Sequence, residues 1–403
     1  MQTPIPEYLT ELLDDCAGDT SGATADYIPE LGEADPNRLA LALCTPDGTV
    51  YSVGDDSIEF TIQSISKPFA YALALRDRGM EEVDEHVGVE PSGDPFNEIS
   101  VDPESGRPRN PMINIGAITT HCLVGNPSLT TKARAAVVLD GLSRFAGRTL
   151  EVDESVHASE YSTRYRNVAL ASMARSNGFI DIEPDDAVWG YTMQCSALVT
   201  VRDLSVMAMT LALGGRNPVT GEQVVPQWVC RQVLSVMTTC GMYDAAGDWL
   251  SHVGIPAKSG VSGGLLGSLP GQVGIGAFSP RLDDFGNSVR GVQLCERLSA
   301  DMSLHIMELP PPSIDAIGWR SQTDDGDPLI VVQGPMTFPT AELVLRRFEQ
   351  LPDNGCGIVI DLNPVTRINR VGARMLHEGI RRLEQDGHTV TVLQPEGLLA
   401  SLS

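Results

Sequence analysis

The sequence predicts a mixed α+β chain made of two unlike units, and three observations support this prediction. Leu309–Ser313 holds three consecutive prolines, which favour a stiff, extended spacer. Before this run, helix-like and strand-like segments alternate with many glycine turns. After it, short apolar runs alternate with amphipathic segments. We therefore expect a large unit over residues 1–308, a linker at 309–313 and a small α/β unit over 314–403.

Composition and charge limit the classes of partner. The chain has 403 residues, of which 28 are basic and 53 acidic, giving a formal net charge of −25 at pH 7. A negative field of this size repels phosphate backbones and anionic membranes, so we expect neither nucleic acid nor membrane as a partner. The same acidic, hydrated surface predicts activity that persists in molar salt. A steep loss of activity at that salt concentration would contradict this prediction.

The amino terminus and the cysteines predict a cytoplasmic protein. Residues 1–16 contain no lysine, no arginine and no apolar stretch of signal-peptide length. No run of about 18 apolar residues is present for a membrane span. The eight cysteines are scattered without a Cys-x-x-Cys pair, which argues against a disulfide scaffold and a zinc knuckle. We expect buried free thiols, no metal and no cofactor.

Ser64 and Lys67 form a Ser-x-x-Lys motif at the start of a predicted helix. Apolar residues recur over 69–75 and Gly79 suits the helix end, while Pro68 is tolerated in a first helical turn. Positions i and i+3 share a helix face, so the Lys67 amine can reach the Ser64 hydroxyl. A desolvated lysine with a lowered pKa can then activate a serine nucleophile. Taken alone, the motif favours an N-cap serine beside a solvated lysine, which is the commoner case, because Ser and Lys three apart recur by chance in a long chain.

A second lysine motif, Lys258-Ser259-Gly260, favours the catalytic interpretation. It is comparable to the Lys-Thr-Gly strand of serine β-lactamases and penicillin-binding proteins. Only three of the 28 basic residues are lysines, and two of these three lie in the two motifs. In that architecture the strand borders the helix of the nucleophile. One backbone N–H from the strand and one from Ser64 can therefore form an oxyanion hole.

Seven further segments occur around these motifs: Tyr27-Ile28-Pro29-Glu30-Leu31, Asn110-Pro111-Met112-Ile113-Asn114-Ile115-Gly116-Ala117-Ile118, Ser159-Glu160, Arg166-Asn167, Tyr191-Thr192-Met193-Gln194-Cys195-Ser196, Cys240-Gly241-Met242-Tyr243-Asp244 and Gly286-Asn287-Ser288-Val289-Arg290-Gly291. Together they resemble the serine-dependent glutaminase family over about residues 5–305, in family order. The resemblance implies a serine β-lactamase-like core, with an antiparallel sheet flanked by helices and a helical subdomain. It also implies hydrolysis of L-glutamine to L-glutamate and ammonia by a homodimer or homotetramer.

The resemblance implies the following catalytic roles. Ser64 would attack the side-chain amide carbonyl, Lys67 would take its proton, and Tyr243 would relay or donate a proton to the leaving ammonia. Val261 would add its backbone N–H to that of Ser64 around the oxyanion. Ser262 stands where the family commonly has glycine. We expect the backbone path to stay open there, so that the rate differs and the reaction type does not.

The same resemblance implies how a zwitterionic substrate is held. Glu160 matches the anion that pairs with the α-ammonium group. Asn167 lies seven residues later, which predicts that it shares a helix face with Glu160, two turns along. Asn114, Tyr191 and Tyr27 match the positions that hold the α-carboxylate.

In the C-terminal unit, three short apolar runs predict buried strands of one sheet, at residues 329–333, 357–362 and 389–393. A helix is predicted to cross between the last two, because Leu376, Ile380 and Leu383 share one face and Gly387 suits a left-handed C-cap. This order, with residues 359–376, resembles the STAS domain of anti-sigma-factor antagonists and of anion-transporter tails.

In the STAS antagonists, the loop before the second helix carries a phosphorylated serine. The corresponding run here is Asn369-Arg370-Val371-Gly372, which has no hydroxyl to accept a phosphate. The resemblance therefore implies a docking or oligomerisation module, through which a protein partner would bind, rather than a phosphoswitch.

Two other functions remain open from the sequence. A β-lactamase or penicillin-binding-type acyl transferase would share the fold, although the chain has no Ser-Asp-Asn motif; turnover of a chromogenic cephalosporin would support it. A regulatory or scaffold protein would bind glutamine and release no ammonia. The intact set of Ser64, Lys67 and Tyr243 argues against that second alternative.

Overall fold

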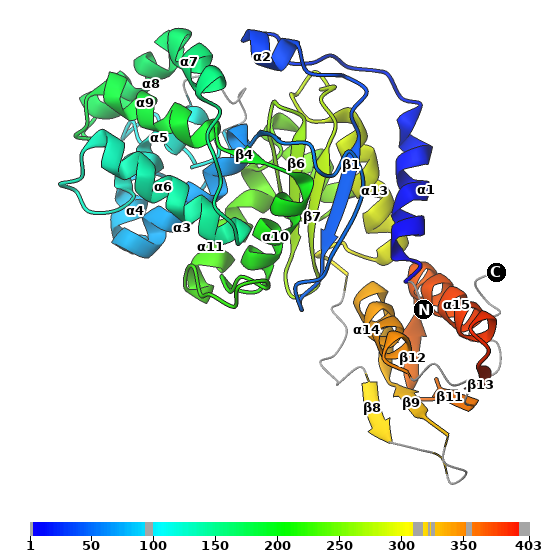
Figure 1. Ribbon diagram of the computed structural model, residues 1–403. Helices are drawn as coiled ribbons and strands as arrows, with labels where there is room; N and C mark the ends of the chain where they lie inside the picture. The colour runs from blue at the N-terminus through cyan, green and yellow to red at the C-terminus, as the bar shows by residue number, and fades with distance from the viewer. Residues whose placement is uncertain are drawn as a thin grey trace. The chain divides into compact units, whose positions relative to one another are not determined.

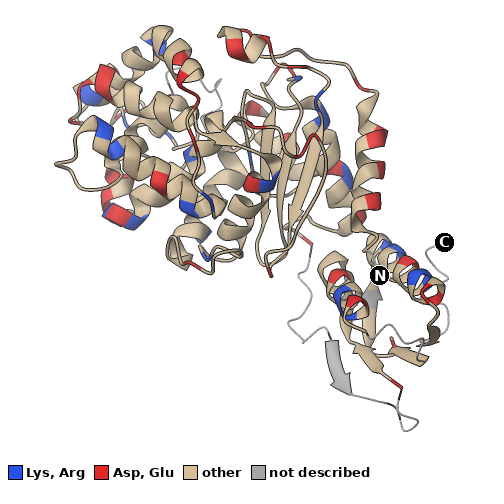
Figure 2. Ribbon diagram, in the orientation of Figure 1, with Lys and Arg blue, Asp and Glu red and all other residues tan. Residues whose placement is uncertain are grey.

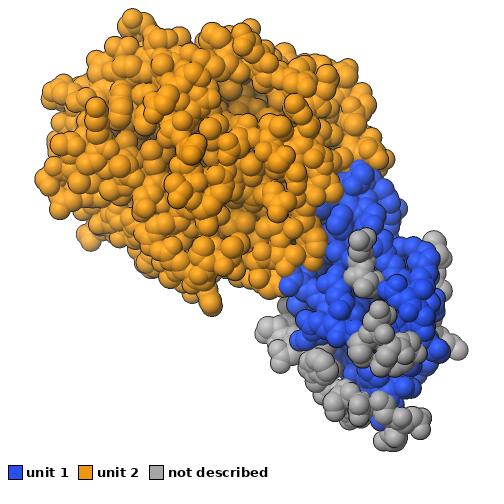
Figure 3. Space-filling model, viewed as in Figure 1, with its two compact units in different colours: residues 1–11, 297–403 blue, residues 12–296 orange. Residues whose placement is uncertain are grey.

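The computed structural model of the chain describes residues 3–92, 100–308, 317–320, 323, 327–351 and 357–394. The chain divides into two compact units, coloured in Figure 3. The large unit comprises residues 12–296, and the small unit comprises residues 1–11 and 297–403. The linker predicted at 309–313 lies outside the described residues, and the boundary at that point stays a prediction.

A five-stranded sheet forms the centre of the large unit (Figure 1). The strand order is β2-β1-β7-β6-β5, and each neighbouring pair is antiparallel. This arrangement, with helices around it, confirms the predicted α+β class. The strands are β1 (Ala40–Cys44), β2 (Val50–Gly54), β5 (Ala257–Ser259), β6 (Gly264–Leu269) and β7 (Val273–Phe278), and a separate pair is β3 (Phe60–Thr61) with β4 (Leu198–Val199).

Helices cover both faces of this sheet, which explains why every residue of β6 and β7 is buried. On one face, α10 (Val201–Ala212) lies very close to β7. A Cβ atom at Gly274 or at Gly276 would lie 2.2 Å from a backbone carbonyl oxygen of α10. Only glycine allows this approach. On the other face, Gly291 of α13 (Val289–Met302) packs against Leu265 of β6.

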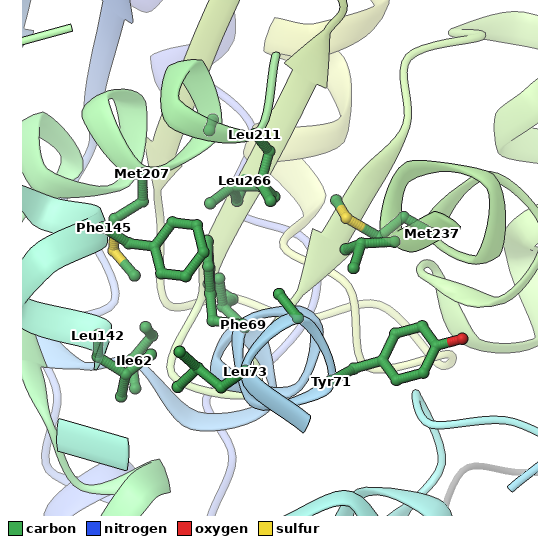
Figure 4. Packing of buried hydrophobic residues seen from close by; sticks show 14 of the residues in the cluster. Ile62, Phe69, Tyr71, Leu73, Leu142, Phe145, Met207, Leu211, Met237 and Leu266 are labelled. Carbon is green, nitrogen blue, oxygen red and sulfur yellow. The ribbon is translucent and has the colours of Figure 1, made fainter. Parts of the chain in front are cut away.

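The helical subdomain is built around α3 (Lys67–Arg78), the helix of the Ser-x-x-Lys motif. Figure 4 shows Phe69 and Leu73 of α3 on the side of Leu142 and Phe145, while Tyr71 points to the opposite side. The Phe69 and Phe145 rings are tilted, with centroids 4.9 Å apart. The helix is buried through residue 75, so the motif at its start is held by a packed core.

The other helical elements of the chain before residue 257 are α1 (Ile5–Ala17), α2 (Pro29–Gly32), η1 (Gln63–Ser66), α4 (Met80–His86), α5 (Asn114–Leu123), α6 (Thr131–Ala146), α7 (Glu154–Ser162), α8 (Tyr165–Ser176), α9 (Pro184–Cys195), α11 (Gln227–Cys240), η2 (Tyr243–Ala245) and α12 (Ala246–His252). The predicted start and end of the motif helix are confirmed. A 3₁₀ turn, η1, holds Ser64, and α3 ends at Gly79, which has a φ of +82°.

The small unit contains a four-stranded sheet of order β13-β11-β9-β8. Strands β9, β11 and β13 are parallel and match the three predicted strands, whereas β8 is antiparallel. The prediction that residues 389–393 are buried is wrong: β13 is exposed or half-buried along its length, because it lies at the sheet edge, where fewer neighbours cover it. The elements are β8 (Ile317–Arg320), β9 (Leu329–Val332), β10 (Gly334–Met336), α14 (Phe338–Glu349), β11 (Gly357–Asp361), β12 (Val365–Ile368), α15 (Arg370–Gln385) and β13 (Thr389–Leu393).

Helix α15 follows the predicted pattern. Leu376 and Leu383 are buried, and Gly387 adopts a φ of +91° just after the helix. At the other end, the Asn369 side-chain oxygen accepts the backbone N–H of Gly372 over 2.7 Å, which caps the helix. Asn369, the first residue of the run that corresponds to the phosphorylated loop of the STAS antagonists, thus has a structural role at the helix start.

Charged side chains lie mainly on helices and loops, and the strands β6 and β7 carry none (Figure 2). The seven cysteines of the described residues are free and buried, as predicted, and Cys356 lies outside those residues. Within the part of the chain that the structure describes, no helix is both long and apolar enough to span a lipid bilayer.

Candidate active site

A cavity of about 260 Å³ lies where η1 meets the ends of α7, α8 and α9. Its size is slightly below the ~300–1,000 Å³ of pockets for drug-sized ligands, which suits a molecule as small as an amino acid. Seven of the nine residues singled out from the sequence line it, namely Tyr27, Ser64, Asn114, Glu160, Asn167, Tyr191 and Val261. The other two, Lys67 and Tyr243, contact residues of its wall.

Ser64 lies in η1, which contacts β5, β6 and α9. The residue before it, Gln63, has a φ of +49°. A non-glycine residue in this left-handed region is uncommon and is often found at functional sites. The Ser66 hydroxyl donates to the Gln63 carbonyl oxygen over 2.8 Å. This hydrogen bond therefore holds the backbone next to Ser64 in place.

Lys67 is fully buried at the start of α3. Its Nζ donates to Asn114 Oδ1 over 2.8 Å and to the Met112 carbonyl oxygen over 3.2 Å. Burial lowers the pKa of Lys67 to about 8. A neutral amine has two hydrogens and one lone pair. It can therefore donate to Asn114 Oδ1 and to the Met112 carbonyl oxygen while its lone pair accepts a proton. The lowered pKa gives Lys67 a neutral fraction near neutral pH, which an unperturbed lysine lacks, and this fraction grows as the pH rises past 8.

Tyr243 is the second residue of the site with a left-handed backbone, at a φ of +54°. Its hydroxyl donates to the Ser259 carbonyl oxygen over 3.1 Å and is hydrogen-bonded with Ser64. Burial raises the pKa of Tyr243, so the phenol keeps its proton and can donate it. Lys258 Nζ lies 4.1 Å from the centre of the Tyr243 ring and donates to the carbonyl oxygens of Gly241 and Ser259. The Lys-Ser-Gly strand thus fixes Tyr243 beside the serine.

Glu160 provides the negative charge of the cavity. The Tyr27 hydroxyl donates to its Oε1 over 2.7 Å, and the Gln63 side chain is also hydrogen-bonded to it. Burial, together with the nearby Glu30, raises the pKa of Glu160 above the usual glutamate value. A bound cation would offset this cost by pairing with the carboxylate.

Asn114 links the two ends of the cavity. Its Oδ1 accepts from Lys67, and its Nδ2 donates to Asn167 Oδ1 over 3.1 Å. The Tyr191 hydroxyl lies 3.5 Å from the same Oδ1. These neutral donors surround the part of the cavity where a carboxylate could accept hydrogen bonds.

The prediction that Glu160 and Asn167 lie two turns apart on one helix is wrong. Glu160 is on α7 and Asn167 is on α8, with the break at Thr163 and Arg164. The Thr163 hydroxyl bonds the carbonyl oxygens of Ser159 and Glu160, and Arg164 Nη1 donates to the Tyr161 carbonyl oxygen. Side chains thus take up the last carbonyls of α7, which ends the helix without a glycine or proline. Both residues nevertheless face the same cavity.

Val261 belongs to a tight turn between β5 and β6. Gly260 N–H bonds the Gly264 carbonyl oxygen, and Gly263 has a φ of +94° with no room for a Cβ. Ser262 does not have a left-handed backbone, so a side chain is accommodated there without backbone strain. This agrees with the expectation that the backbone path stays open.

Sequence reasoning missed five cavity residues: Gln63, Thr163, Arg166, Thr192 and Cys195. Four of them could have been found by position, since Gln63 and Arg166 directly precede predicted site residues, Thr192 follows Tyr191, and Cys195 lies one helical turn after Tyr191. Thr163 lies at the break between α7 and α8, which the sequence did not reveal. Cys195 is hydrogen-bonded with Tyr191 and Ser66, and burial raises its pKa to about 12. The thiol is therefore protonated and is unsuited to act as a nucleophile.

Among the described residues, no group of three or more His, Cys, Asp or Glu side chains is arranged to hold a metal ion. The cavity offers a serine, an amine, a phenol and one carboxylate instead. This set is suited to acyl transfer on a small substrate that carries a positive charge.

Comparison with known proteins agrees with this chemistry. Residues 22–307 match the Glutaminase family model. A glutaminase of Corynebacterium glutamicum is 51% identical over 397 residues, which cover 98% of this chain and 95% of that protein. The chain belongs to the glutaminase family. It is accordingly an enzyme of the amidohydrolase class.

Solved structures confirm the glutaminase fold. Mglu "in its glutamate form" is 45% identical, with a TM-score of 0.76 and coverage of 98% of this chain and 99% of that chain. A structure described as "Probable glutaminase ybaS" is 35% identical, with a TM-score of 0.73 over 76% of this chain and 98% of that chain. Residues 319–401 match the STAS domain model, so a STAS domain follows the glutaminase region.

Proposed function

We propose that the chain hydrolyses L-glutamine to L-glutamate and ammonia through an acyl-enzyme on Ser64. The observation that supports this most directly is the position of a buried lysine with a pKa of about 8 three residues after Ser64, together with the hydrogen bond between Ser64 and Tyr243. Glu160 in the same cavity suits the α-ammonium group of an amino acid.

Acylation begins when Ser64 Oγ attacks the side-chain amide carbon of glutamine. Lys67 takes the hydroxyl proton, and the backbone N–H groups of Ser64 and Val261 stabilise the negative oxygen that forms. The C–N bond then breaks, and Tyr243 supplies the proton with which ammonia leaves. Protonated Lys67 then returns its proton to the Tyr243 oxygen, so that Lys67 becomes neutral again. Water then attacks the ester carbon and gives one proton to Lys67, which is neutral at this stage. The ester C–O bond breaks, that proton passes to Ser64 Oγ, and glutamate and the free serine result.

Substrate recognition uses the opposite end of the cavity. Glu160 pairs with the α-ammonium, and Asn114 and Tyr191 donate to the α-carboxylate, with Asn167 beside them. The Tyr27 hydroxyl, which donates to Glu160 without substrate, turns to the α-carboxylate once the ammonium occupies Glu160. The relative Mglu is described in a glutamate form, and glutamate is the product of the reaction proposed here.

The first test is ammonia release from L-glutamine by the purified chain, with Ser64→Ala measured beside it. We expect turnover by the wild type and a loss of about 10³-fold or more in kcat for Ser64→Ala. Equal activity of both proteins would contradict the serine mechanism. Binding of glutamine by the wild type without release of ammonia would instead support the scaffold alternative.

We also propose that the chain acts in the cytoplasm as a homodimer or homotetramer, and that its STAS domain docks a partner protein or a second copy. The family resemblance supports the oligomer. Deletion of the residues after Pro312, followed by measurement of both mass in solution and activity, tests whether the STAS domain takes part in assembly.

A further inference from the structure

A row of buried polar side chains ends at the residue before the nucleophile. His121 Nδ1 lies 2.9 Å from Gln194 Oε1, Gln194 Nε2 donates to Ser66 Oγ over 2.9 Å, and Ser66 Oγ donates to the Gln63 carbonyl oxygen over 2.8 Å. These residues come from α5, α9 and η1, and none is more than 3% exposed. The chemical steps proposed above use neither His121, Gln194 nor Ser66.

The hydrogen-bond chemistry gives this row a single direction. Because Gln194 directs its NH₂ group to Ser66, its oxygen faces His121 and has to accept. His121 therefore carries its proton on Nδ1. Burial lowers the pKa of His121 to about 4, so the ring is neutral throughout the neutral range. A Cβ at Gly190 would lie 2.4 Å from His121 Nε2, so glycine there makes room for the ring.

The acceptor at the end of the row determines the orientation of the nucleophile's own amide. The Gln63 carbonyl and the Ser64 N–H belong to one planar trans peptide group and point in opposite directions. Fixing the carbonyl toward Ser66 therefore fixes the Ser64 N–H toward the other side. Gln63 also has the strained φ of +49°, a conformation that persists only where its surroundings hold it.

We infer that His121, Gln194 and Ser66 are positioning residues that orient the Gln63–Ser64 peptide so that the Ser64 N–H points at the developing oxyanion. This inference rests on the proposed acyl-enzyme mechanism. An oxyanion donor acts in the transition state, so its misorientation lowers kcat and leaves KM for glutamine nearly unchanged. A purely structural role would lower the melting temperature and leave kcat unchanged.

Ser66→Ala tests the inference, with Ser268→Ala as the matched control. Ser268 in β6 is equally buried and donates to the Ala208 carbonyl oxygen over 2.8 Å, so both variants lose one buried hydroxyl-to-carbonyl bond. Ser66→Ala also removes the acceptor of Gln194 Nε2. We therefore expect the melting temperature to fall in both variants, and further in Ser66→Ala. We expect kcat to fall about 10- to 100-fold in Ser66→Ala and to stay unchanged in Ser268→Ala, with KM within about threefold of wild type in both. This decrease is smaller than the ~10²–10³-fold that complete removal of an oxyanion donor costs, because the Ser64 N–H remains present.

Gln194→Met, which keeps a side chain of similar length and shape, extends the test. It is expected to lower kcat in the same way. The double variant with Ser66→Ala should be no slower than Ser66→Ala alone, because Gln194 acts through Ser66. The inference is overturned if Ser66→Ala keeps wild-type kcat, as the control does, or if the two losses multiply. Ser64→Ala in the same assay separates the two proposals: if it retains activity, the acyl-enzyme mechanism itself is contradicted.

Discussion

The two ends of the cavity differ in how their polar groups are held. At the reacting end, Lys67 is fully buried and Ser64 is 7% exposed, and backbone carbonyls hold both Lys67 and Tyr243. At the recognition end, Tyr27 is 48% exposed and Glu160 is held by other side chains. At the reacting end, exclusion of water therefore shifts the pKa values of Lys67 and Tyr243. At the recognition end, pairing of charges sets the affinity for the substrate. Changes at the first end should alter kcat, and changes at the second should alter KM.

After removal of the nucleophile itself, the largest effect is expected for Lys67→Arg. Arginine keeps the positive charge but remains protonated at every working pH, so it cannot accept the serine proton. We expect kcat to fall by about 10³-fold, within the ~10²–10⁴-fold typical of general-base catalysis. Lys132→Arg is the matched control, since Lys132 is exposed at the start of α6 and its exchange should leave kcat unchanged. Retention of most activity by Lys67→Arg would show that another group is the base.

A smaller effect, confined to the recognition end, is expected for Glu160→Gln. The amide keeps the shape and an acceptor for the Tyr27 hydroxyl but lacks the charge that pairs with an ammonium group. A charge-assisted hydrogen bond contributes about 1.5–3 kcal/mol, so KM should rise about 10- to 100-fold, with kcat within about threefold. Glu154→Gln, at an exposed position of the same helix, should match the wild type. If Glu160→Gln instead lowered kcat and left KM unchanged, the recognition end would not act on substrate binding alone, and the expected division of effects between the two ends would be wrong.

The smallest effect is the dependence of the wild-type rate on pH. Burial lowers the pKa of Lys67 to about 8, and the neutral amine is the active form. The ratio kcat/KM should therefore rise with pH, about tenfold between pH 7 and pH 9, with its midpoint near 8. Steady-state rates across this range, on enzyme shown to keep its fold, measure the midpoint. A flat profile, or a midpoint at the usual lysine value near 10.5, would argue against Lys67 as the base.

Much of the reacting end could be predicted because its chemistry is local in the sequence. Ser64 and Lys67 are three residues apart, Pro68 and Gly79 mark the limits of the helix, and the second lysine motif pointed to the strand that holds Tyr243. These features depend on backbone preferences that operate within a few residues. The resemblance to a known family then connected them with Glu160 and the other recognition residues.

The features that could not be predicted depend on contacts between distant segments. The break between α7 and α8 comes from Thr163 and Arg164, and Arg164 also pairs with Asp185 of α9, over 2.7 Å. No glycine or proline marks this break in the sequence. The left-handed backbone of Gln63 is likewise supported by Ser66 and, through it, by Gln194, 128 residues away from Ser66. Hydrophobic periodicity contains no information about such contacts.

The asparagine cap of α15 has a consequence for signalling through the STAS domain. Asn369 bonds the Gly372 N–H with a neutral amide, and this group has the same state at all times. A phosphorylated serine keeps a record of a past enzymatic event for as long as the phosphate stays attached. The run Asn369-Arg370-Val371-Gly372 has no hydroxyl, so no such record can be written there. A molecule that docks at this end of α15 would meet the same surface whatever kinase or phosphatase had acted before.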